Sequence, residues 1–163
     1  MEINYLDVTI GTLITEIIFM AIFLFIVVKL TNVSKWYKEL GLGAVLSDVT
    51  VIILCIAITS FLYPLIFNKF NIFVFTGLAV AIQITHDILF SKIIKLIPSG
   101  NSRIINIFKS YSESAGFDVL FTDSMMIVSS ILFMKFIEGF SLKQKMFILI
   151  LSLYILPYFL YSF

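Results

Sequence analysis

The chain of 163 residues is 61% hydrophobic and only 13% charged, and its mean hydropathy is +1.11. Soluble domains contain roughly half apolar and a quarter charged residues, so this composition excludes a soluble globular protein and favours a membrane protein. A formal net charge of +1, with basic residues scattered along the chain, excludes the clustered basic face that nucleic acid binding requires. The single cysteine, Cys55, excludes an intrachain disulfide and a cysteine-rich metal site.

The apolar residues form five runs, each long enough to cross a hydrocarbon core, which takes about 20 helical residues. The sequence therefore predicts an all-α integral membrane bundle of five transmembrane helices in a single membrane domain, 1–163. The expected helices cover residues 6–30, 43–67, 71–97, 117–137 and 143–162. Short connections predict an up-and-down order, and Pro64 and Pro157 are expected to kink their helices or end them early.

Two connections have the composition of a membrane interface. Residues 31–40 mix Trp36 and Tyr37 with lysines, as is common at headgroup level. Residues 98–114 repeat apolar side chains every three or four positions, which predicts a short interfacial amphipathic helix before the fourth membrane helix. Each connection ends in Tyr-x-Glu and a glycine, Gly41 or Gly116, that is expected to turn the chain back into the membrane. The residues expected at the interface or as helix caps are Trp36, Tyr37, Glu39, Tyr111 and Glu113.

The sequence pattern of the first two predicted membrane helices recurs in the third and fourth. Ile14-Thr15-Glu16-Ile17 recurs as Ile84-Thr85-His86-Asp87-Ile88, and Gly41 to Asp48 recurs as Gly116 to Asp123. We interpret residues 1–70 as a first repeat, 71–140 as a second, and 141–163 as an additional C-terminal transmembrane helix. The second copy begins after two crossings, so both copies enter the membrane in the same direction. The pattern predicts an internal parallel duplication of helices 1–2 and 3–4.

The basic residues predict the orientation in the membrane. Seven of the 11 flank the first and third connections, and the other four lie on the opposite side. The positive-inside rule then places the N-terminus outside and the C-terminus in the cytosol.

Acidic and polar side chains lie within or beside the apolar runs. Gln83, Asp87, Ser91 and Lys95 recur every four residues and so share one face of a helix. If such faces point inward, the bundle has a polar interior. The residues of this proposed polar core or ion path are Glu16, Asp48, Gln83, His86, Asp87 and Asp123.

Two interpretations of these acids remain open. Intramembrane carboxylates cost a few kcal/mol each and often line paths for protons or cations. Alternatively, they form hydrogen bonds to neighbouring helices and fix how the helices pack. Asp48 and Asp123 also lie near the expected starts of their helices, where the helix dipole favours negative charge.

Enzymatic and metal-binding patterns are absent from the sequence. His86 and Asp87 are adjacent, and because adjacent helical residues point about 100° apart, they are not expected to act as a dyad. No His-x-x-x-His or Glu-x-x-His spacing occurs, nor does a nucleophile elbow or a phosphate-binding glycine loop. We therefore expect a non-enzymatic protein with no metal and no cofactor.

Three segments carry a resemblance to a known family. They are Gln83-Ile-Thr-His-Asp-Ile-Leu-Phe90, Phe108-Lys-Ser-Tyr111-x-Glu113 and Asp123-Ser-Met-Met126. This pattern resembles an uncharacterised family of multi-pass membrane proteins in nucleocytoplasmic large DNA viruses. The resemblance implies a structural component of a virion inner membrane, or of a host internal membrane. Its partners would be membrane lipids, capsid or other membrane proteins, or further copies of the chain. The alternative is a small proton or cation channel or transporter that uses the duplicated carboxylates.

Overall fold

A computed structural model of the chain describes residues 3–25, 31–100 and 102–162, without the side chains of residues 31–35 and 111–118. This part of the chain forms helices and contains no strand, as the sequence predicts. The helices are α1 (Tyr5–Phe25), α2 (Thr31–Leu40), α3 (Leu42–Ile66), α4 (Ile72–Leu96), α5 (Arg103–Ile137) and α6 (Leu142–Leu160).

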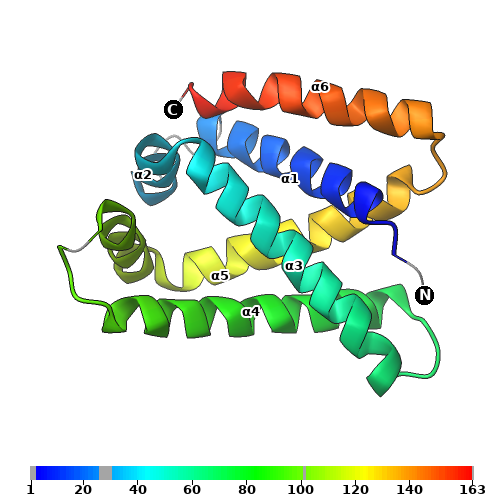
Figure 1. Cartoon of the computed structure of the whole chain (residues 1–163), viewed down its shortest axis with the longest axis horizontal. Coiled ribbons are helices and arrows are strands. Elements are labelled where there is room, and N and C mark those ends of the chain that lie inside the picture. Colours follow the sequence, from blue (N-terminus) through cyan, green and yellow to red (C-terminus); the bar gives the residue numbers. More distant parts are fainter. Residues whose placement is uncertain (1–2, 26–30, 101, 163) are drawn as a thin grey trace.

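Five segments are long and apolar enough to cross a membrane, which is consistent with a multi-pass integral membrane protein. Four of them are α1, α3, α4 and α6, and the fifth is Val119–Ile137 within α5. Successive segments alternate in direction (Figure 1). The N-terminus, the α3–α4 loop and the α5–α6 loop lie at one end, and α2, the α4–α5 loop and the C-terminus lie at the other. We call the second of these the α2 end of the bundle.

Local signals explain where several helices begin and end. The Asn71 side chain caps α4 by accepting hydrogen bonds from the backbone N–H groups of Phe73 and Val74 at 2.9 and 3.3 Å. Ser141 and Gln144 form a capping box at the start of α6. Pro64 and Pro157 lie inside α3 and α6, close to their C-terminal ends. The chain therefore leaves each helix soon after its proline, as expected.

The structure corrects one local prediction and confirms another. Residues 98–114 do not form a separate interfacial helix, because α5 runs without interruption from Arg103 to Ile137. Gly116 therefore has a helical backbone and does not make the expected turn. The first turns of α5 instead run at an angle to the rest of the helix (Figure 1). Gly41 does make its turn, since its φ of 55° lies in the left-handed region that glycine tolerates. Residues 26–30, the predicted end of the first helix, lie outside the described residues.

Helix α1 lies in the middle of the bundle and packs against α3, α5 and α6 (Figure 1). The closest approach is at Gly11, where a Cβ atom would lie 2.7 Å from the Met134 backbone nitrogen and 2.8 Å from the Ser130 carbonyl oxygen. Much of the outward surface of α4 and α6 consists of exposed apolar side chains, such as Phe73, Leu96 and Phe147. Such faces suit contact with lipid tails. The internal duplication remains a prediction.

Candidate functional site

A cavity of about 720 Å³ lies among α3, α4 and α5, with Trp36 of α2 in its lining. Each of these three spanning helices contributes one carboxylate to the lining: Asp48 from α3, Asp87 from α4 and Asp123 from α5. Asp48 is in the second turn of α3, and Asp87 lies about 14 Å along the helix axis from the end of α4. The cavity therefore occupies the half of the bundle nearer the α2 end.

A fourth carboxylate lies behind this lining. Glu16 of α1 is 0% exposed and interacts electrostatically with Asp48 and Asp123. Asp87 in turn interacts electrostatically with Asp48 and Asp123. We call Glu16, Asp48, Asp87 and Asp123 the carboxylate cluster. It brings four acidic side chains from four different helices together inside the bundle.

Helix α2 supplies hydrogen-bond donors to half of this cluster. The Tyr37 hydroxyl donates to Glu16 Oε1 at 2.9 Å, and the Trp36 indole N–H donates to Asp48 Oδ2 at 3.2 Å. Both aromatic side chains are buried, although the sequence pattern predicts headgroup-level residues. Two adjacent residues thus tie α2 to α1 and to α3. Their aromatic rings are typical of an interface, and nothing in the local sequence indicates that their polar atoms point inward.

Asp87 receives its hydrogen bonds from its own helix. Gln83 Nε2 donates to both carboxylate oxygens, at 2.9 and 3.1 Å, as expected for side chains four residues apart. His86 Nδ1 lies 3.0 Å from Asp87 Oδ1, so these two adjacent side chains are in contact. The Cα–Cβ bonds diverge, but both side chains are long enough to turn toward each other. The imidazole also stacks on Phe90, with centroids 5.8 Å apart.

Several buried polar atoms have no hydrogen-bond partner among the described residues. They are Thr12 Oγ1, Thr15 Oγ1, Glu16 Oε2, Gln83 Oε1 and Ser130 Oγ. Buried polar atoms usually have partners, so each of these requires a reason. Thr12, Thr15 and Glu16 lie within little more than one turn of α1, and Ser130 lies where α5 approaches Gly11. The hydroxyls of Thr12, Thr15 and Ser130 therefore extend the polar interior from the carboxylate cluster along the α1–α5 contact.

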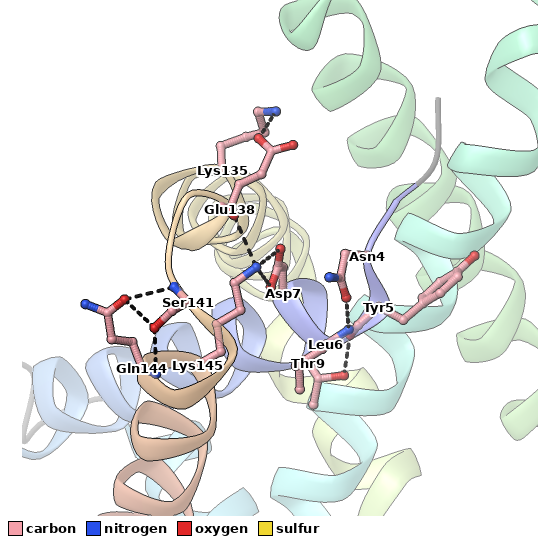
Figure 2. Close-up of polar contacts among 10 residues, drawn as sticks. All are labelled: Asn4, Tyr5, Leu6, Asp7, Thr9, Lys135, Glu138, Ser141, Gln144 and Lys145. Carbon is pink, nitrogen blue, oxygen red and sulfur yellow. Dashed lines mark hydrogen bonds and ion pairs between the residues drawn. The ribbon is translucent and has the colours of Figure 1, made fainter.

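A buried ion pair joins α1 to α6 at the opposite end of the bundle. Lys145 Nζ lies 2.7 Å from both carboxylate oxygens of Asp7, and it also donates to the Glu138 carbonyl oxygen at 3.2 Å (Figure 2). Both side chains of the pair are buried. This pair could not be predicted from the sequence. The partners are 138 positions apart, and no local pattern connects them.

The remaining predicted interfacial residues have less defined roles. Gly41 is the N-cap of helix α3 and provides no side-chain hydrogen bond there, and the Glu39 carbonyl oxygen accepts a hydrogen bond from Arg103 at 3.4 Å. The side chains of Tyr111 and Glu113 lie outside the described residues. In the part of the chain that is described, no three His, Cys, Asp or Glu side chains are arranged to hold a metal ion.

No protein-family model matches the chain, and neither a curated protein nor a solved structure shows significant similarity to it. The class that the structure supports is a multi-pass membrane protein with a carboxylate-lined cavity. The geometry of that cavity is therefore the basis for inferring the function.

Proposed function

We propose that the protein conducts or transports protons or other small cations, and that the carboxylate cluster forms its binding site within the membrane. The observation that supports this proposal is the convergence of Glu16, Asp48, Asp87 and Asp123 from four spanning helices. Among the described residues, no Lys or Arg side chain forms an ion pair with any of them. Four acids without a Lys or Arg partner are costly in a bilayer, and a cation would offset that cost.

The polar residues beyond the cluster suggest a direction for the path. A cation or proton would enter the cavity near the α2 end and reach Glu16 through Asp48 or Asp123. The unpartnered hydroxyls of Thr12, Thr15 and Ser130 then continue along the α1–α5 contact. Hydroxyl groups can both donate and accept hydrogen bonds, so they suit the relay of a proton.

A structural role in a viral membrane is the second candidate. It follows the resemblance described above, and the hydrogen bonds that α2 makes to Glu16 and Asp48 favour it. In that role the acids would fix how the helices pack, and the outer faces would meet lipids, capsid proteins or other membrane proteins. The two candidates differ in what the acids must do. A scaffold requires hydrogen bonding only, whereas a conductor requires titratable or cation-binding groups.

The deciding experiment is ion flux through purified protein in liposomes under imposed proton, sodium and potassium gradients. The variants Glu16→Gln and Asp123→Asn keep the shape of the side chain and remove its charge. Glu138→Gln changes an exposed acid outside the cluster and is the matched control. We expect flux in the wild type and in the control, and its loss in the two cluster variants, with all four proteins folded by circular dichroism. Absence of flux in the wild type under every gradient would refute conduction, and the structural role in a membrane would then be the supported function.

A further inference from the structure

The cavity is larger than a bare ion alone requires. A water molecule in the liquid takes up about 30 Å³, whereas sites for small molecules typically measure about 300 to 1,000 Å³. The volume of about 720 Å³ lies within the second range. Apolar side chains, among them Val51, Ile88 and Met126, make up much of the lining. These features suit a molecule with an apolar body.

The inner part of the cavity presents hydrogen-bond acceptors and acidic groups. Asp48, Asp87 and Asp123 line it, and Gln83 lines it as well. Gln83 is 2% exposed, and its Nε2 group donates a hydrogen bond to Asp87. Its Oε1 atom has no hydrogen-bond partner among the described residues. A carbonyl oxygen beside three acidic groups accepts a hydrogen bond from an N–H donor, and a positively charged donor also interacts favourably with the acids. A primary ammonium group supplies three such donors on one atom.

The outer part of the lining is positively charged. Lys92 and Lys95 line the cavity five and eight residues beyond Asp87 on α4, which places their Cα atoms about 8 and 12 Å further along the axis. Neither lysine forms an ion pair within the described part of the chain. Two ammonium groups at this end of the lining would attract an anionic group on a ligand.

We propose that the cavity binds a zwitterionic ligand, with its ammonium group against Asp48, Asp87, Asp123 and Gln83 and its anionic group near Lys92 and Lys95. This inference goes beyond the proposed function, because it concerns a second ligand of the same cavity. Two sources share this chemistry: a phospholipid with an ethanolamine headgroup, and a soluble molecule that carries an amine and a phosphate. The apolar lining favours the lipid.

Trp36 provides a direct measurement of binding. It is the only tryptophan of the chain, it lines the cavity, and its indole N–H contacts Asp48. Purified protein in detergent is titrated with short-chain phosphatidylethanolamine while the fluorescence of Trp36 is recorded. The comparison probes are short-chain phosphatidylglycerol, which lacks the ammonium group, hexylamine, which lacks the anion, and O-phosphoethanolamine, which lacks the apolar chains.

Variants of the protein then test the contacts to the ammonium group and to the anionic group of the ligand separately. Asp87→Asn is expected to weaken the binding of phosphatidylethanolamine at least tenfold, as is typical for the loss of a charged hydrogen bond of about 1.5–3 kcal/mol. The double variant Lys92→Gln, Lys95→Gln is expected to weaken phosphatidylethanolamine binding by a similar factor and to leave hexylamine binding unchanged. Glu138→Gln and Lys135→Gln change exposed charges outside the cavity and are the matched controls. The thermal transition of each variant shows that it is folded.

A saturable response to phosphatidylethanolamine that depends on Asp87 and on the lysines supports the inference. A similar response to O-phosphoethanolamine also supports it and identifies a soluble ligand. If phosphatidylglycerol or hexylamine binds as tightly as phosphatidylethanolamine, the inference of a zwitterionic ligand is rejected. The lack of any Asp87-dependent response also rejects it. Proton or cation flux in liposomes is measured separately. Flux without zwitterion binding therefore rejects this inference and leaves the proposed function intact.

Discussion

Replacing Gly11 with alanine is expected to force α1 away from α5 and to destabilise the bundle. The added Cβ would lie 2.7 Å from the Met134 nitrogen and 2.8 Å from the Ser130 oxygen, about 0.7 Å short of ordinary van der Waals contact at 3.4 Å. Both neighbours are backbone atoms of a helix, so no side-chain rotation can relieve the contact. The two helices must separate, or one must shift along the other.

The magnitude follows from two opposing effects. Overpacking of a tight contact costs about 1–3 kcal/mol. Alanine favours a helix over glycine by up to about 1 kcal/mol, which offsets part of that cost. We expect Gly11→Ala to lower the free energy of unfolding by about 1–2 kcal/mol. Gly77 is exposed within α4, and an added Cβ there would have no atom within 4 Å. Its replacement by alanine therefore changes only the helix propensity. Gly77→Ala should therefore leave stability unchanged or raise it by up to about 1 kcal/mol.

Unfolding by sodium dodecyl sulfate in mixed micelles, followed by circular dichroism, measures both variants against the wild type. Gly11→Ala should unfold at a lower fraction of the denaturing detergent than the wild type, and Gly77→Ala should not. If the two substitutions had the same effect, the close approach of α1 to α5 would be refuted. The position of Ser130 beside α1, and with it the proposed path along that contact, would then also be withdrawn.

The other predictions concern hydrogen bonds and charges within the bundle. Tyr37→Phe removes the donor to Glu16 and should cost about 1–3 kcal/mol in the same unfolding assay, because the acid is fully buried. Lys145→Met leaves Asp7 buried without its partner and should cost about 3–5 kcal/mol. Adding Asp7→Asn to Lys145→Met should restore a large part of that loss, since the uncompensated charge is then gone.

Exposed residues of the same type provide the controls for these two predictions. Tyr161→Phe and Lys143→Met alter side chains at the surface of the described structure and should change stability by less than about 0.5 kcal/mol. A Tyr37 variant as stable as its control would show that α2 does not anchor the cluster. Additive effects of the two changes at Lys145 and Asp7 would show that the ion pair does not form.

The sequence by itself determined the class of the protein and its spanning helices. The length and hydropathy of each apolar run depend on neighbouring residues alone, so the five spans were predicted to within a few residues at most ends. Gly41 and the two prolines were predictable for the same reason, since each acts on its own backbone. The continuous α5 was not predicted. A helix break at Gly116 depends on packing as well as on the residue, and the local pattern of residues 98–114 favoured a separate helix equally well.

Only the tertiary structure decided how the polar residues meet. Periodicity assigned Asp48, Asp87 and Asp123 to faces of their helices, but the rotation of each helix about its axis depends on packing against the others. That rotation brings the three acids to one cavity and places Glu16 behind them. The donors from α2, and the pairing of Asp7 with Lys145, join residues far apart in the chain. Such contacts arise from the folded arrangement, because a sequence pattern records only what lies within a few turns.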